Sequence, residues 1–170
     1  MRTADGFVFI DGRMVRGHAV SEGGITEVFE GPYSGKPDLF GVILPALIDT
    51  HTHCADAGVK PEPGMTLEEL VAPPDGLKHR YLRETPRDVL VKDMHAFGEL
   101  AASNGIVTFV DFREGGAEGC RMAREACASA VILGRPSAPE ADLIELEDIL
   151  SVADGIALSS LTDVGYAAAE

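Results

Sequence analysis

The sequence predicts an α/β fold in which about four βα units on a parallel sheet follow a small antiparallel β unit. From residue 43 onward, short apolar strand runs alternate with helical stripes, and this alternation implies right-handed crossovers and a parallel sheet. The earlier residues instead carry short strands separated by turn residues. The length of 170 residues suits one domain with a small appendage. We therefore expect a β-sandwich-like unit over residues 1–42 and an α/β domain over 43–170.

The N-terminal region is predicted to form β-hairpins. The apolar run 7–10 leads into Asp11-Gly12, a two-residue hairpin signal, and residues 13–16 return. Gly23-Gly24 then turns the chain into a third strand over 25–29. So few apolar residues cannot stabilise this unit alone.

The α/β domain begins at a nearly continuous apolar run over residues 42–48, which is typical of a strand buried on both faces of a parallel sheet. A segment rich in proline and glycine, from Ala55 to about Glu84, is expected to be a long loop, either functional or disordered. Periodicity then predicts strands at 43–52, 106–112, 130–134 and 156–160, and helices at 86–103, 117–128 and 140–152.

Composition and charge exclude several classes of partner. The formal net charge of −14 repels phosphate backbones and anionic membrane surfaces, so we expect no nucleic-acid or membrane partner. The longest apolar stretch, residues 40–48, contains Pro45 and is far shorter than the ~20 residues of a membrane helix. The start of the chain has no signal core. Three cysteines without zinc-finger spacing favour free thiols in a reducing cytoplasm.

A His-x-His pair is the most informative feature of the sequence. His51 and His53 stand at the carboxyl end of the first predicted parallel strand, the end at which α/β folds place their sites. Side chains at i and i+2 point to the same side, about 7 Å apart at their roots, so the two imidazoles can converge on one ion. Asp49 shares that face and is expected either to orient an imidazole as an acceptor beyond the ligands or to support the strand end. The alternative to a metal site is that His51 and His53 are simply polar residues at the point where a strand leads into a loop.

The segment Pro45-Ala46-Leu47-Ile48-Asp49-Thr50-His51-Thr52-His53 resembles the first-strand signature of the amidohydrolase superfamily, the metal-dependent hydrolases. Their pattern is Pro-Gly-x-Ile-Asp-x-His-x-His, so Ala46 replaces a glycine here. The run 105–111 also looks like the second barrel strand of that family. The resemblance is specific at residues 41–53.

The resemblance implies a TIM-like (β/α)8 barrel, of which this chain would hold about four βα units. It also implies metal-dependent hydrolysis of non-peptide carbon–nitrogen or related bonds, in the manner of a deaminase or chlorohydrolase. His51 and His53 would bind a divalent metal, zinc first, with iron or manganese as alternatives. A full barrel takes about 250 residues, so we expect a partial form that is inactive in isolation. Ser159 and Ser160 stand where two-metal members carry a lysine, which favours a one-metal site.

Three further residues are candidates for contact with a small-molecule substrate. Glu114 and Arg135 follow the second and third predicted strands, and His79 lies in the long loop that can fold over the site. Loop polarity and helix capping are the alternative explanation for each.

Two other interpretations remain open. One is a non-catalytic β/α assembly or binding module, because a piece of a barrel leaves sheet edges that a second copy or another chain must cover. We accordingly expect a homo-oligomer or a missing C-terminal half. The other is an open α/β sheet with structural histidines.

Overall fold

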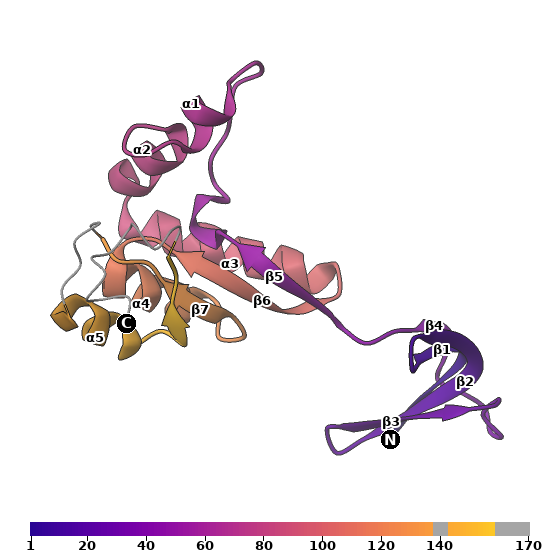
Figure 1. Cartoon of the computed structure of the whole chain (residues 1–170). Coiled ribbons are helices and arrows are strands. Elements are labelled where there is room, and N and C mark those ends of the chain that lie inside the picture. Colours follow the sequence, from indigo (N-terminus) through magenta and orange to yellow (C-terminus); the bar gives the residue numbers. More distant parts are fainter. Residues whose placement is uncertain (138–142, 159–170) are drawn as a thin grey trace. The chain divides into compact units, whose positions relative to one another are not determined.

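The computed structural model describes residues 1–137 and 143–158. The chain divides into two compact units, Met1–Ala46 and Leu47–Glu170, which Figure 1 shows as an all-β part and an α/β part. The boundary expected between residues 42 and 43 would cut the strand β4 (Leu39–Ile43). Within the described ranges, no helix is long and apolar enough to cross a bilayer.

The first unit is a four-stranded sheet with the order β3-β2-β1-β4. The strand β1 (Arg2–Ile10) pairs antiparallel with β2 (Arg13–Glu22), which pairs antiparallel with β3 (Ile25–Glu30). Asp11 and Gly12 both have positive φ, 48° and 79°, as the predicted two-residue hairpin requires. The strand β4 pairs parallel with β1, so the sheet is mixed and not purely antiparallel as predicted. Residues 31–38 cross over before β4, and this long-range pairing leaves no local sequence signal.

The second unit contains the predicted parallel sheet. Its strands are β5 (Leu47–Thr52), β6 (Ile106–Arg113), β7 (Val131–Gly134) and β8 (Gly155–Ile156). They neighbour one another in sequence order, and every pair is parallel. An open doubly wound sheet reverses its strand order at a switch point, whereas a (β/α) barrel does not. The order therefore matches a partial barrel, not an open sheet.

Three helices connect these strands and cover the core: α3 (Arg87–Ser103), α4 (Gly116–Ala126) and α5 (Leu143–Leu150). They confirm the three predicted helices to within a few residues at each described end. Met94 of α3, Cys120 of α4 and Ile149 of α5 are fully buried with Phe109 and Ile132 of the sheet. This apolar layer holds the strands whose carboxyl ends carry the polar residues described below.

The apolar run 42–48 is not one buried strand, as was predicted. It divides between β4 and β5, with the break at Pro45, which has no backbone N–H to donate to a sheet ladder. Leu47 and Ile48 are 54% and 61% exposed. In the part of the chain that the structure describes, β5 is the edge of its sheet, so the exposure follows from the absence of a neighbour on that side.

The segment expected to be a loop after β5 contains three short helical pieces, η1 (Cys54–Asp56), α1 (Leu67–Val71) and α2 (Leu77–Glu84). Thr66 and Glu69 form a capping box at the start of α1. The hydroxyl of Tyr81 on α2 donates to Asp93 on α3, which fastens this excursion to the barrel helices. The predicted strand residues Ser159 and Ser160 lie outside the described residues.

Candidate functional site

The two histidines of the motif lie together at the carboxyl end of β5. Their ring centroids are 5.4 Å apart at an interplanar angle of 67°. The ring of His51 stacks on Phe112 of β6 at 4.3 Å, and that of His53 is tilted against the same phenyl ring at 6.2 Å. Both imidazoles therefore lie on the same side of β5, as the spacing of two residues predicts.

A register shift between Asp49 and Thr52 includes His51, the first histidine of this pair. On β5 the chain runs from Asp49 to Thr52 while β6 runs only from Phe109 to Asp111. One extra residue on one strand is the mark of a β-bulge, which re-aims side chains near sites. Here Asp49 Oδ1 accepts a hydrogen bond from the backbone N–H of His51 at 3.2 Å. This contact fits the second role expected for Asp49, support of the strand end.

The orientation of the His53 ring is set from β6. Nδ1 of His53 lies 2.9 Å from the backbone carbonyl of Phe112 and 3.3 Å from Oε1 of Glu114. Both oxygens are acceptors, so Nδ1 carries the hydrogen and Nε2 of the neutral ring keeps its lone pair. Histidines that ligate metals have this arrangement, with one nitrogen donating to a carbonyl or carboxylate and the other on the metal.

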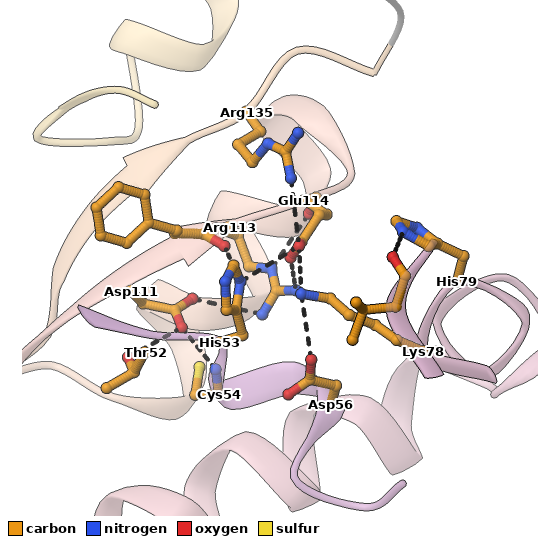
Figure 2. Close-up of polar contacts among 12 residues, drawn as sticks. Thr52, His53, Cys54, Asp56, Lys78, His79, Asp111, Arg113, Glu114 and Arg135 are labelled. Atoms are coloured by element: carbon orange, nitrogen blue, oxygen red, sulfur yellow. Dashed lines mark hydrogen bonds and ion pairs between the residues drawn. The ribbon is translucent and has the colours of Figure 1, made fainter. Parts of the chain in front are cut away.

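Glu114 is the centre of a partly buried network of charges, drawn in Figure 2. Its side chain is 14% exposed. Oε1 lies 2.7 Å from Nζ of Lys78 and 3.7 Å from Nη1 of Arg135, and Oε2 accepts from Nη2 of Arg113 at 2.7 Å. Lys78 also lies 3.2 Å from Asp56. Three segments far apart in the sequence thus meet at one carboxylate.

The charge of Glu114 is stabilised by these neighbours. Burial by itself would raise the pKa of Glu114, but its hydrogen bond with His53 and the positive charges of Arg113 and Lys78 outweigh burial. Together they hold the pKa of this carboxyl well below its usual range. Glu114 is accordingly ionised at neutral pH, and a charged carboxylate is the stronger acceptor for the imidazole N–H.

A second carboxylate fastens the end of β5 to β6. Asp111 is fully buried, and its Oδ1 accepts from the backbone N–H of Cys54 at 2.6 Å and from the hydroxyl of Thr52 at 3.3 Å. Its Oδ2 pairs with Arg113 at 3.4 Å. Since Thr52 and Cys54 flank His53, these bonds fix the backbone on both sides of that histidine.

The structure places the three predicted substrate contacts differently. Glu114 and Arg135 belong to the network around His53. His79 binds the carbonyl of Val71 at 3.1 Å, and in Figure 2 it lies apart from the cluster around Glu114. This bond lies within the α1–α2 excursion. A substrate contact by any of the three stays a prediction.

Sequence reasoning missed Lys78 and Arg113 as members of the site. Lys78 adjoins the predicted His79, and it is this lysine, on α2, that reaches Glu114. Arg113 was expected only as one of several polar residues after the second predicted strand that could contact substrate, and its side chain is 1% exposed. A signal was available for Arg113, because Asp111 and Arg113 alternate with Phe112 and must share one face of the strand.

The donor set fits part of a metal site. Two imidazoles with one ring nitrogen already fixed suit zinc, which takes neutral histidine nitrogen ligands. Among residues 1–137 and 143–158, no group of three or more His, Cys, Asp or Glu could hold a metal ion. The thiol of Cys54 is fully buried, and this burial raises its pKa.

Proteins of similar sequence are found in archaea. The chain is 37% identical over 163 residues to an uncharacterized protein of Methanocaldococcus jannaschii, covering 90% of this chain and 42% of that protein. It is 36% identical over 135 residues to a Methanothermobacter thermautotrophicus protein whose name proposes an aminohydrolase, covering 72% of this chain and 35% of the relative. The chain thus spans less than half the length of these relatives. No family model matches the chain.

Solved structures show the same fold. Atrazine chlorohydrolase from Arthrobacter aurescens, in a complex with zinc, superposes with a TM-score of 0.65 at 15% identity and covers 96% of this chain and 45% of its own. Guanine deaminase from E. coli superposes with a TM-score of 0.60 at 17% identity, over 89% of this chain and 43% of its own. These comparisons confirm the resemblance to the amidohydrolase superfamily, over the N-terminal part of its members.

Proposed function

We propose that this chain forms the N-terminal half of a metal-dependent hydrolase of the amidohydrolase type, which breaks non-peptide carbon–nitrogen bonds with a metal-activated water. His51 and His53 are the proposed ligands of one divalent metal ion, zinc by preference. The second half of the barrel would supply the remaining ligands, either as further chain or as another polypeptide. Deamination, with release of ammonia, is the proposed reaction class.

The observation that carries this proposal is the state of His53. Its Nδ1 is occupied by the Phe112 carbonyl at 2.9 Å, which leaves Nε2 as the lone-pair nitrogen. The ring of His51, a second candidate ligand, lies 5.4 Å away between centroids. The pair also lies at the carboxyl ends of parallel strands, where barrel enzymes carry out their chemistry.

The chain's own residues prepare this site before any ligand arrives. Phe112 gives one ring a backbone acceptor and the other a stacking surface, and Asp111 fixes the backbone on both sides of His53. Both imidazoles are neutral ligands, so they would leave the charge of the ion undiminished. When bound, a divalent cation supplies the Lewis acidity that makes water a nucleophile at neutral pH.

The substrate is proposed to be a small organic molecule with an exocyclic or amide nitrogen. This class agrees with the aminohydrolase names of two relatives and with the deaminase name of one structural neighbour. The net charge of −14 would disfavour polyanionic substrates. A cytoplasmic location and a homo-oligomeric assembly remain parts of the same proposal.

Zinc binding by histidine variants tests the metal site. The unmodified chain and the His51→Ala and His53→Ala variants are loaded with zinc, and their affinities are measured by competition with a chromophoric chelator. Each variant should lose most of the bound zinc, because each removes one of two imidazole ligands.

His95→Ala is the matched control. His95 is an exposed histidine on α3 whose ring bonds Ala126 and lies near Glu99, so its removal should leave zinc binding unchanged. Zinc affinity that is the same in all three variants would refute the proposed metal site.

The alternative of an assembly module has one specific observation in its favour. The edge strand β5 exposes Leu47 and Ile48, and an open apolar edge invites pairing with another chain. This alternative is tested by measuring the mass in solution of the unmodified protein and of Ile48→Lys by light scattering. A dimer that this variant dissociates, in a protein that binds no zinc, would favour the module over the hydrolase.

A further inference from the structure

We propose that Glu114 is a positioning residue, which holds the ring of His53 in the tautomer that leaves Nε2 available to a metal ion. The role of the ion rests on the proposed function, whereas the orientation of the ring does not. This assigns Glu114 to the support of a ligand and not to contact with substrate.

The first step of the argument is the competition for Nδ1 of His53. The carbonyl of Phe112 at 2.9 Å and Oε1 of Glu114 at 3.3 Å both face this nitrogen, and neither can donate a hydrogen. A neutral histidine in water prefers to carry its hydrogen on Nε2. Two acceptors on Nδ1 reverse that preference, because the other tautomer would set a lone pair against two oxygens.

The second step is that Glu114 is itself held. Arg113 binds Oε2 at 2.7 Å, and Lys78 lies 2.7 Å from Oε1. Their side chains are buried or nearly so. A carboxylate whose two oxygens are already engaged by partly buried cations is poorly placed to bind a substrate, since it would first have to give up these partners. It is well placed to hold a neighbouring ring still.

The third step concerns the backbone around Glu114. A Cβ atom on Gly119 would come within 2.0 Å of the Glu114 carbonyl oxygen, so the first turn of α4 packs directly on this residue. Lys78 approaches from α2 and Arg113 from the end of β6. Glu114 is therefore fixed by main chain as well as by side chains, as a residue that orients a metal ligand must be.

The tautomer can be observed directly in the metal-free protein. Ring nitrogen-15 shifts of His53, recorded about one and a half pH units above the ordinary histidine pKa of ~6.5, should show hydrogen on Nδ1. In Glu114→Ala the Phe112 carbonyl still accepts from Nδ1, so the population should move only in part toward hydrogen on Nε2. In Glu114→Gln, whose amide oxygen still accepts, most of the original tautomer should remain. Hydrogen on Nε2 in the unmodified protein would overturn the inference without any variant.

Zinc affinity provides the second measurement. Removal of a group that orients a metal ligand typically weakens binding by about 10–100-fold, and we expect a loss of that size in Glu114→Ala. Glu114→Gln should lose less, because it keeps the acceptor and loses only the charge. Glu118→Ala, an exposed carboxylate on α4 that pairs with Arg87, is the matched control and should bind zinc normally.

The two readouts separate this inference from the proposed function. If Glu114→Ala does not fold, the tautomer population and the zinc affinity of Glu114→Gln, each compared with the unmodified protein, still decide the matter. Unchanged zinc affinity in both Glu114 variants would overturn the positioning role even where the histidine variants lose zinc. Histidine variants that keep their zinc would refute the metal site, while the tautomer of His53 would still show whether Glu114 orients the ring.

Discussion

The two units of the molecule each contain an aspartate–arginine pair, and the two pairs differ in burial. In the first unit, Arg16 donates to both oxygens of Asp5 at 2.9 and 2.5 Å, and the side chains of Arg16 and Asp5 are 40% and 8% exposed. In the second unit, Arg113 lies 3.4 Å from Asp111, and the two side chains are 1% and 0% exposed. The geometrically better pair is the more solvated one.

Both aspartates also bind backbone. Asp5 accepts from the N–H of Tyr33 at 3.0 Å and so ties down the connection between β3 and β4. Asp111 accepts from the N–H of Cys54 and so fixes the chain beside His53. An aspartate that pairs with an arginine and accepts from a backbone N–H therefore stabilises a loop in the first unit and a candidate site in the second. The two pairs thus differ in the burial of the arginine. The buried arginine, Arg113, belongs to the pair that lies beside the candidate ligand His53.

The largest expected effect comes from Arg113→Ala. This change leaves Asp111 buried without its cation and deprives Glu114 of one partner, and breaking a buried pair typically costs about 3–5 kcal/mol of unfolding free energy. Chemical denaturation followed by circular dichroism measures the loss, since the chain has no tryptophan. Arg16→Ala, the counterpart in the first unit, should cost clearly less. Equal losses would contradict the comparison.

A smaller effect is expected from Gly119→Ala. The added methyl group would collide with the backbone of Glu114, and forced packing of this kind typically costs about 1–3 kcal/mol. Gly17→Ala is the counterpart in the first unit, where the Cβ would approach the Phe29 carbonyl at 2.5 Å. Both variants should lower the melting temperature, but only Gly119→Ala should also weaken zinc binding. Weaker zinc binding in both would show that stability, not the position of Glu114, controls the metal site.

The smallest effect at neutral pH is expected from Asp5→Asn, and it should depend on pH. The hydrogen bond from Arg16, with that from Tyr33, lowers the pKa of Asp5 below the usual value for an aspartate. A lowered pKa contributes stability that is present above the unfolded pKa and is lost as the pH falls through the folded one. The unmodified protein should therefore lose stability below about pH 4 more steeply than Asp5→Asn. The free energy of unfolding is measured with urea at a series of pH values. An equally steep fall below about pH 4 in both proteins would contradict this assignment.

Much of the fold could be predicted because its signals are local. Asp11-Gly12 specifies a tight hairpin through its own φ angles, and the apolar stripes of α3 and α4 show in their periodicity. The run 42–48 was predicted to be one strand because nearly all of its residues are apolar. The break between β4 and β5 at Pro45 was therefore missed. The helix α2 was missed because a segment rich in proline and glycine masked its eight residues.

The candidate site could be predicted only in outline. His51 and His53 stand out because an alternation of two places them on one side of a strand. Lys78 could not be identified, because nothing near it in the sequence indicates that α2 brings its ammonium group to Glu114. Glu114 was found as a strand-end residue, but its four charged or ring neighbours, His53, Lys78, Arg113 and Arg135, could not be read from the sequence.

The sequence by itself determined the order of the elements, the hairpin turns and the paired imidazoles, since each depends on residues only a few positions apart. The tertiary structure decided which charges are buried and which nitrogen of His53 is left free. Those properties depend on groups up to about sixty positions away in the chain, which meet only when β6 and α2 pack against the end of β5. Burial and hydrogen bonding at such a meeting point are products of the packed chain, and no local pattern of residues encodes them.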